Sequence, residues 1–178
     1  SEPISSYRLF ESGLEIEGVS VVDEKSTEAI LSFGDITDLA IKVALSPTNM
    51  DGALKNLQIE APHWKFGQYK REARELWNQQ LSRVSVETSD QAAKTTFYTA
   101  LYHSFIAPTL FSDVDGLYRG ADTLRTVNQA NGWENYTVYS LWDTFRANHP
   151  LFTLLQQDRM PDLIKSMLVH YQEYGLLP

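Results

Sequence analysis

The first 46 residues show short runs of apolar and branched side chains that are typical of β-strands. Leu14 to Ile16 alternates apolar and polar positions, and residues 20–22 follow a glycine. Segments 29–33 and 39–45 are rich in branched residues and end at turn-forming pairs. Together these runs predict an antiparallel sheet with one face in water. Forty residues cannot close a β-sandwich, so we expect the last strands of one that begins upstream.

From Thr48 onward the apolar positions follow a helical period, and no further strands are expected. Thr48 or Asn49 can cap a helix that ends before Pro62, and Ser89 can cap another that ends before Pro108. Between them lies a long amphipathic helix. Its apolar face comprises Tyr69, Ala73, Leu76, Trp77, Leu81 and Val84. The helix after Ser89 carries an aromatic stripe that is typical of a core, made of Phe97, Tyr98, Leu101, Tyr102 and Phe105.

A last helix is expected from Pro161, which suits a first helical position, to Gly175, which suits a left-handed cap. One side of this helix is expected to pack in the core. That side comprises Leu163, Ile164, Met167, Leu168 and Tyr171. Strands followed by helices predict the α+β fold class.

The stretch from Tyr136 to Pro150 concentrates aromatic, charged and imidazole side chains, and its pattern predicts a helix up to the proline. On that helix Tyr139, Trp142, Asp143 and Arg146 share one face. A flat ring beside a carboxylate and a guanidinium suits a polyhydroxylated ligand, because the ring offers an apolar plane and the charges offer directional hydrogen bonds. The alternative is an Asp143–Arg146 surface ion pair beside core aromatics, and the pattern alone leaves both interpretations open.

Residues 111–135 form a turn-rich segment with the sequence Asp113-x-Asp115-Gly116. This resembles the start of a calcium-binding loop. The EF-hand pattern fails, because Leu117 and Asp122 stand where an oxygen ligand and a glutamate are required. The segment can still line a ligand site, since binding groups often lie on loops held by a rigid scaffold.

Composition excludes several classes of function. The net charge of −8 argues against nucleic-acid binding, which needs a clustered basic surface. The absence of cysteine excludes disulfides and thiolate catalysis. No run approaches the roughly 18 apolar residues of a membrane span. The first and last residues look like the interior of a longer protein, so we expect a fragment.

Read together, these segments resemble the α-mannosidases of glycoside hydrolase family 92. The most specific motif is Tyr139-Ser-Leu-Trp-Asp-Thr-Phe-Arg-Ala-x-His149-Pro-Leu151. The others, in chain order, are Ile41-Lys-Val-Ala-Leu-Ser46, Ala53-Leu-Lys-Asn56-Leu, Trp64-x-Phe66, Trp77-Asn78-x-x-Leu81, Phe97-Tyr98-Thr-Ala-Leu-Tyr102-His103 with Pro108, Asp113-x-Asp115-Gly116-x-Tyr118-x-Gly120 and Gln172-x-x-Gly175-x-Leu177-Pro178. Their order and spacing carry the resemblance over most of the chain.

The resemblance implies the end of an N-terminal β-sandwich in residues 1–46, linker helices in 47–88 and the start of a catalytic (α/α)6 barrel in 89–178. It also implies hydrolysis of terminal α-linked mannose, usually α-1,2, from N-glycans, with inversion and with a calcium ion. We expect the acid, the base and the main calcium ligands downstream of Pro178, so the fragment itself is expected to be inactive. A bacterial periplasmic, cell-surface or secreted location follows from the family alone.

By the same resemblance, Trp142 and Asp143 contact the terminal mannose, and Arg146 orients Asp143 or lines the pocket. Asp115, Gly116 and Tyr118 are candidates for the pocket edge. The alternative function is a carbohydrate-binding or scaffold module without catalysis, and ordered motif matches disfavour a helical interaction domain. The expected partner is a mannose-terminated glycan. An incomplete barrel also exposes apolar helix faces, through which we expect self-association.

Overall fold

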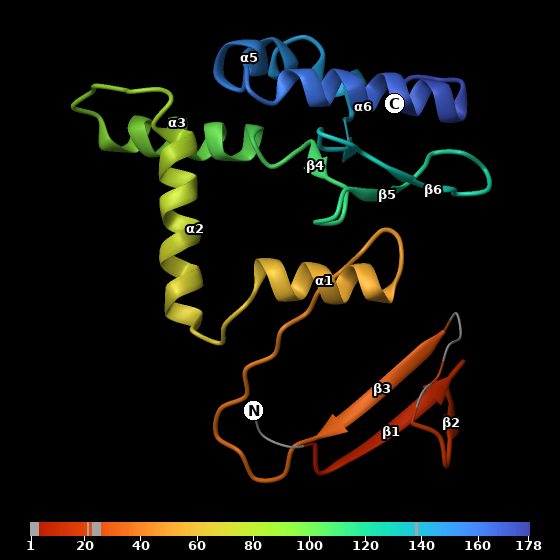
Figure 1. Cartoon of the computed structure of the whole chain (residues 1–178). Helices are drawn as coiled ribbons and strands as arrows, with labels where there is room; N and C mark the ends of the chain where they lie inside the picture. Colours follow the sequence, from red (N-terminus) through yellow and green to blue (C-terminus); the bar gives the residue numbers. More distant parts are fainter. Residues whose placement is uncertain (1–3, 21, 23–25, 138) are drawn as a thin grey trace. The chain divides into compact units, whose positions relative to one another are not determined.

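The computed structural model describes residues 4–20, 22, 26–137 and 139–178. The chain divides into two compact units, Ser1–Lys42 and Val43–Pro178 (Figure 1). Val21, in the strand expected at 20–22, lies outside the described residues. The observed combination of helices with small antiparallel sheets agrees with the predicted mixture of strands and helices.

The first unit contains a three-stranded antiparallel sheet in the order β2-β1-β3. Its strands are β1 (Ser6–Glu11), β2 (Leu14–Ile16) and β3 (Thr27–Ser32). Ser12 and Gly13 join β1 to β2 with φ values of 49° and 82°. Positive φ at both positions is typical of a two-residue hairpin turn, whose twist matches that of the strands. The register pairs Leu9 with Ile16 on one side and with Ala29 on the other.

The strand expected at 39–45 does not form. Branched side chains favour extended backbone there, but a strand also needs a partner along its length. The described strands of this sheet pair only with one another, which leaves segment 39–45 without a ladder.

The second unit is mainly helical, and none of its described helices is long and apolar enough to cross a membrane. Asn49 caps the first helix as predicted, its side chain accepting a hydrogen bond from the Gly52 N–H at 2.9 Å. The cap of the third helix was predicted wrongly. Asp90 takes that position instead of Ser89, because its carboxylate accepts from the Ala93 N–H at 3.0 Å. The helices are α1 (Met50–Glu60), α2 (Phe66–Leu81), α3 (Gln91–Ser104), α4 (Leu141–Thr144), α5 (Asn148–Leu155) and α6 (Met160–Tyr174).

Four short strands lie between α3 and α4, where none was expected. They are β4 (Thr109–Leu110), β5 (Leu117–Arg119), β6 (Val127–Gln129) and β7 (Tyr136–Thr137). β4 pairs with β7, and β5 pairs with β6, both antiparallel. Strands of two or three residues are too short to show an alternating pattern in the sequence.

The continuous helix expected from Tyr136 to Pro150 is also wrong. Tyr136 belongs to β7, and Ser140 precedes α4 in the left-handed conformation, with φ of 47°. A left-handed residue interrupts a helix, so Tyr139 is not on the same helical face as Trp142. Pro150 does not end a helix but lies in the first turn of α5. An N–H at this position would have no acceptor within the helix, so the helix tolerates a proline there.

The core of the second unit lies between α2, α3, β7, α5 and α6. Its buried apolar residues are Leu101, Phe105, Tyr136, Tyr139, Phe152 and Leu163. Leu101 and Phe105 confirm part of the predicted stripe on α3. The predicted packing face of α6 is only partly correct: Leu163 is buried and Met167 packs on the core, whereas Ile164, Leu168 and Tyr171 are exposed. The inward face of α6 instead includes Ser166, which is 2% exposed.

The loop before β5 is tied to the start of the unit by hydrogen bonds to Asp113, which is 4% exposed. The hydroxyls of Ser46 and Thr48 donate to Asp113 Oδ2 at 2.7 and 2.6 Å, and Asn56 Nδ2 donates to Oδ1 at 2.7 Å. Arg119 adds hydrogen bonds to the carbonyls of Pro47 and Thr48 at 2.6 and 2.5 Å. This Asp113 network holds segment 46–56 against the loop before β5.

Asp113→Ala should lower the free energy of unfolding by about 2–4 kcal/mol, because it leaves partly or fully buried donors without an acceptor. Asp115→Ala is the matched control, since it removes the same group from an exposed ion pair with Lys55. Urea denaturation of the chain checks this. Equal midpoints for the two variants would contradict the assigned role of Asp113.

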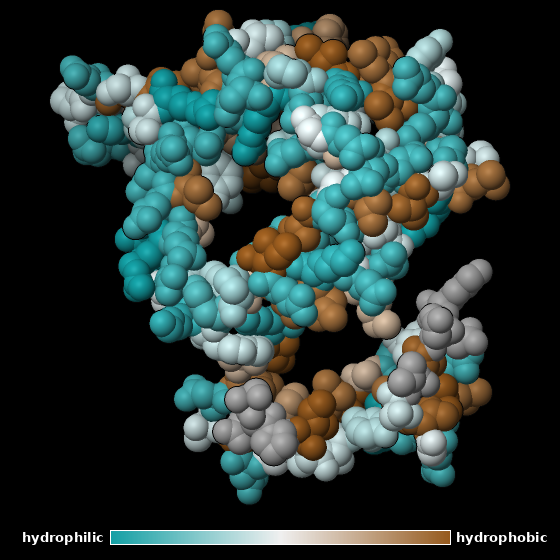
Figure 2. Space-filling model, viewed as in Figure 1, coloured by the Kyte–Doolittle hydropathy of each residue, from teal (hydrophilic) through white to brown (hydrophobic). Residues whose placement is uncertain are grey.

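Apolar side chains also remain uncovered on the second unit: Leu154, Leu168 and Tyr171 are each more than half exposed. Figure 2 shows further hydrophobic side chains, in brown, on the visible surface. Because exposed apolar area favours association, the 178-residue chain should sediment with a weight-average mass that rises with concentration. A stable monomer with a high melting temperature at all concentrations would contradict this prediction.

Candidate functional site

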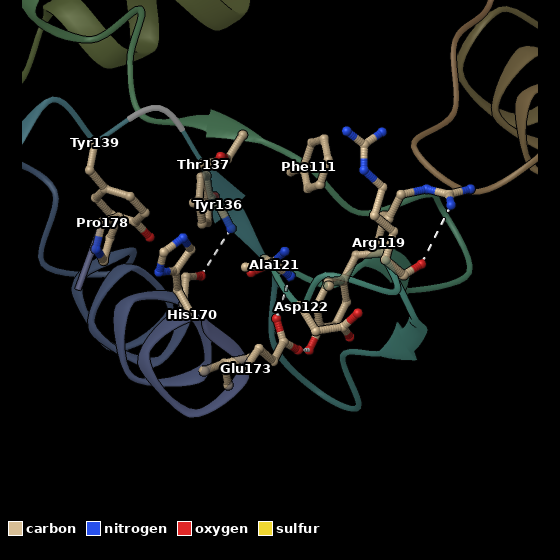
Figure 3. A pocket seen from close by; sticks show the side chains of 16 residues that line it. Phe111, Arg119, Ala121, Asp122, Tyr136, Thr137, Tyr139, His170, Glu173 and Pro178 are labelled. Carbon is tan, nitrogen blue, oxygen red and sulfur yellow. Dashed lines mark hydrogen bonds between the residues drawn. The ribbon is translucent and has the colours of Figure 1, made fainter. Parts of the chain in front are cut away.

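A cavity of about 340 Å³ lies between α6, β7 and the β5–β6 hairpin (Figure 3). Aromatic rings form much of its wall, and charged side chains from the hairpin and from α6 complete it. Figure 3 shows His170 and Glu173 on α6, facing the segments that carry Tyr136 and Ala121. The lining includes Phe111, Tyr118, Asp122, Tyr139, His170 and Glu173.

Glu173 holds the hairpin in place. Its Oε1 accepts hydrogen bonds from Asn128 Nδ2 at 2.7 Å and from the Tyr118 hydroxyl at 3.1 Å. Its Oε2 accepts from the Ala121 N–H at 2.9 Å. One carboxylate on α6 therefore fixes both strands of the hairpin and the loop between them.

The other side of the cavity is fixed by hydrogen bonds to the inward face of α6. The Tyr136 N–H donates to Ser166 Oγ at 2.9 Å, and the Tyr139 hydroxyl donates to the Leu163 carbonyl at 2.9 Å. Ser166 Oγ in turn donates to the Asp162 carbonyl at 2.8 Å. These bonds attach Tyr136 and Tyr139 to α6.

The tyrosines of the cavity stay neutral at physiological pH. Burial, reinforced by the Glu173 carboxylate, raises the pKa of Tyr118 to about 12. Burial also raises the pKa of Tyr139 to about 12 and, together with the hydrogen bond to Glu134, raises the pKa of Tyr136. These phenols can donate hydrogen bonds, but they cannot serve as bases or nucleophiles near neutral pH.

Three polar side chains pack closely around Gly120 and leave no room for a side chain at this position. A Cβ at this position would lie 3.1 Å from Asp122 Oδ2, 3.2 Å from Glu173 Oε2 and only 2.9 Å from Asn128 Nδ2. Asp122 accepts hydrogen bonds from the Thr126 N–H, which hold the pKa of this carboxyl below its ordinary value. Asp122 is therefore ionised at neutral pH. The three hydrogen-bond donors to Glu173 all belong to the β5–β6 hairpin. Both carboxylates are therefore engaged in hydrogen bonds within the unit.

The structure places Trp142, Asp143 and Arg146 outside this cavity. All three are exposed, Trp142 by 84%. The Arg146 guanidinium lies 4.9 Å from the centre of the Phe145 ring. No Asp143–Arg146 ion pair occurs among the described residues, so the charges of both side chains face solvent.

The three candidates for a pocket edge fall in different places. Tyr118 lines the cavity with its hydroxyl on Glu173. Asp115 and Gly116 line a separate depression beside Trp133. Asp115 is paired with Lys55 at 2.8 Å, and Gly116 has φ of 82° in a tight turn against the Ala130 carbonyl.

Sequence reasoning missed Glu173, Asn128 and Ser166 as residues that shape the cavity. Glu173 and Ser166 occupy the helical period of the last helix together with Leu163, but polar residues on such a face are normally assigned to solvent. Asn128 carries no local signal, because its partner is 45 residues away. Only the three-dimensional contact reveals its role.

The described residues contain no group of three or more histidine or acidic side chains that could hold a metal ion. Asp113 accepts three side-chain hydrogen bonds and Asp115 pairs with Lys55, so the calcium-like part of the loop uses its carboxylates for internal contacts.

Comparison with known proteins identifies the relatives of the chain. The glycosyl hydrolase family 92 catalytic domain matches residues 52–178. The family GH92 α-mannosidase BT3965 from Bacteroides thetaiotaomicron is 30% identical, with a TM-score of 0.80 over 98% of this chain and 25% of that one. The family GH92 inverting mannosidase BT2199 from the same organism is 28% identical, with a TM-score of 0.83 over 100% of this chain and 24% of that one.

A second structure of BT3965, in complex with mannoimidazole, is 28% identical, with a TM-score of 0.79 over 98% of this chain and 24% of that one. No curated protein sequence gives a significant match. The chain thus spans about a quarter of the length of the solved relatives. Because the family's catalytic domain matches more than half of the chain, the protein belongs to glycosyl hydrolase family 92.

Proposed function

We propose that the chain is part of an inverting exo-α-mannosidase that removes terminal α-linked mannose, preferentially α-1,2-linked, from N-glycans. The observation that carries this proposal is the family 92 catalytic-domain match over residues 52–178. Two relatives support it further: BT2199 is an inverting mannosidase, and BT3965 forms a complex with mannoimidazole. Linkage preference rests on the family resemblance alone.

The architecture proposed for the parent enzyme is a β-sandwich, linker helices and an (α/α)6 barrel. In this architecture residues 1–46 form the last strands of the sandwich, residues 47–88 form the linker helices, and residues 89–178 form the first part of the barrel. The exposed strand β3 supports this, because its apolar side chains Ile30 and Leu31 lack a covering layer among the described residues. The exposed helix faces of the second unit support an incomplete barrel in the same way.

Within this proposal Trp142 and Asp143 bind the terminal mannose. Trp142 offers an unobstructed ring, which suits the apolar face of a sugar, and Asp143 offers oxygens that accept hydrogen bonds from its hydroxyls. Arg146 lies three positions further along the chain, just beyond α4, and would orient Asp143 once substrate is bound. The exposure of all three leaves them available to a ligand.

The inverting mechanism needs one protonated and one ionised carboxyl, roughly 6.5–9.5 Å apart. Asp122 and Glu173 do not fit, since both carboxylates accept hydrogen bonds from the hairpin they help to hold. By the family resemblance, the acid, the base and the main ligands of a calcium ion would come from sequence outside these 178 residues.

The 178-residue chain alone should release no mannose from α-1,2-mannobiose, with or without calcium, because the proposed acid and base lie outside it. Anion-exchange detection of free mannose checks this, with the parent enzyme as the positive control. Calcium-dependent turnover by the chain alone would show that the acid and the base lie within it.

In the parent enzyme, Asp143→Ala should lower kcat/KM by at least about tenfold, because hydrogen bonds from substrate hydroxyls to a carboxylate contribute roughly 1.5–3 kcal/mol each. The melting temperature should stay unchanged, since Asp143 is exposed. Asp38→Ala, which removes another exposed carboxylate, this one from the first unit, is the matched control and should keep full activity.

Unchanged kcat/KM in the Asp143 variant would mean that this carboxylate does not contact substrate. The alternative function, a carbohydrate-binding module without chemistry, is favoured by one observation: the carboxylates of the described cavity are engaged in structural hydrogen bonds. A parent protein that binds mannosides but releases no mannose would support that alternative.

A further inference from the structure

Ser140 lies two positions before Trp142 and has an unusual backbone conformation. Its φ is 47° and its ψ is 46°, in the left-handed region that residues other than glycine rarely adopt. Ser12 and Arg125, which also have positive φ, lie between the paired strands of β-hairpins, where the reversal of the chain accounts for it. Ser140 instead joins β7 to α4, so its conformation needs another explanation.

Hydrogen bonds hold Ser140 in this conformation. The Thr144 hydroxyl lies 3.0 Å from the Tyr139 carbonyl oxygen and 3.1 Å from the Ser140 carbonyl oxygen, so it can donate to both. The Ser140 carbonyl also accepts from the N–H groups of Asp143 at 2.9 Å and of Thr144 at 3.2 Å. These bonds close a tight turn from Tyr139 to Thr144, and Trp142 and Asp143 lie within it.

The inner side of this turn is attached to the core. Tyr139 is 4% exposed, its side chain points toward α6 (Figure 3), and its hydroxyl donates to the Leu163 carbonyl at 2.9 Å. Leu141, at the start of α4, packs against the core, and Thr144 lies three positions later on the same helical face. The exposed Trp142–Asp143 pair lies between these two residues. The turn therefore sets the direction of the pair, because its own side chains face solvent.

The turn needs the Thr144 hydroxyl because its other parts are weak. The helix α4 has four residues, and a single helical turn is unstable by itself, since its backbone angles must be fixed for very few hydrogen bonds. A left-handed serine adds to this cost. The hydroxyl binds the carbonyl on each side of the Ser140 Cα, so it opposes rotation about both backbone angles of this residue. Strained conformations of this kind persist at functional sites where surrounding contacts hold them.

We propose that Thr144 is a positioning residue for the mannose site. Its hydroxyl holds Ser140 in the left-handed conformation, and this conformation presents the Trp142 ring and the Asp143 carboxylate to the sugar. The inference rests on the proposed function, because it requires that these two residues bind mannose. Thr144 acts through the turn and not by contact with substrate. Without its hydroxyl, Ser140 returns in part to the negative φ that serine favours, and the fraction of enzyme with a competent site falls.

Steady-state kinetics of the parent enzyme on α-1,2-mannobiose test this role. Thr144→Val keeps the shape of the side chain and removes the hydroxyl. Its KM should rise about threefold to tenfold, because apparent affinity falls with the fraction of enzyme that is competent to bind. Its kcat should stay within about twofold of wild type, since bound substrate orders the turn. Thr144→Ser, which keeps the hydroxyl, should restore a KM close to that of wild type.

A second substitution separates this role from a general effect on stability. Glycine adopts the left-handed conformation without the penalty of a Cβ, so adding Ser140→Gly to Thr144→Val should return KM toward the wild-type value. Thr95→Val is the matched control, because the Thr95 hydroxyl also donates to the carbonyl four residues earlier, at 2.9 Å, but lies on α3. This control should keep the wild-type KM. Melting temperatures of all variants ensure that kinetics are compared where each is folded.

The Asp143→Ala variant separates the positioning role from the proposed function. An unchanged KM in Thr144→Val, together with a lowered kcat/KM in Asp143→Ala, would overturn the positioning role and leave the proposed mannose contacts in place. Unchanged kinetics in both variants would overturn the mannose contacts as well. A raised KM that Ser140→Gly does not reduce would mean that Thr144 acts by another route, and this result would also overturn the inference.

Discussion

The second unit depends on the inward face of α6, which accepts hydrogen bonds from segments distant in sequence. The Leu163 carbonyl accepts a hydrogen bond from the Tyr139 hydroxyl, and Ser166 Oγ accepts one from the Tyr136 N–H. The Glu173 carboxylate accepts hydrogen bonds from the β5–β6 hairpin. Each acceptor lies on the same side of one helix, so a single rigid element sets the positions of β7 and the hairpin together. The cavity of Figure 3 is the space enclosed by these attachments.

Most of the helices could be predicted from the sequence, because capping residues and apolar periodicity depend on residues only a few positions apart. The Asn49 cap and the left-handed Gly175, with φ of 87°, were both predictable in this way. The path from Tyr136 to Pro150 was not predictable, because a positive φ at Ser140 carries no glycine signal and the Tyr136 N–H bonds to a residue 30 positions away. The polar face of α6 was missed for the same reason: Glu173 matters through partners that periodicity cannot reveal.

The resemblance to family 92 came from ordered motifs, and the catalytic-domain match confirms it. The sugar-binding roles of Trp142, Asp143 and Arg146 remain predictions, although their exposure leaves them accessible to a ligand. The Asp122 and Glu173 carboxylates both accept hydrogen bonds that hold the segment around the β5–β6 hairpin in place. The chain thus offers exposed side chains that suit sugar binding, and we propose that the groups that carry out the hydrolysis come from elsewhere in the parent enzyme.

The central claim is that Trp142 and Asp143 form one wall of a mannose site in the parent enzyme. A crystal structure of that enzyme with a mannose-derived inhibitor tests it most directly. The account predicts that one face of the inhibitor ring packs on the Trp142 indole and that its hydroxyls donate to the Asp143 carboxylate. An inhibitor bound elsewhere, with the Trp142 ring still in solvent or buried against protein alone, would contradict it.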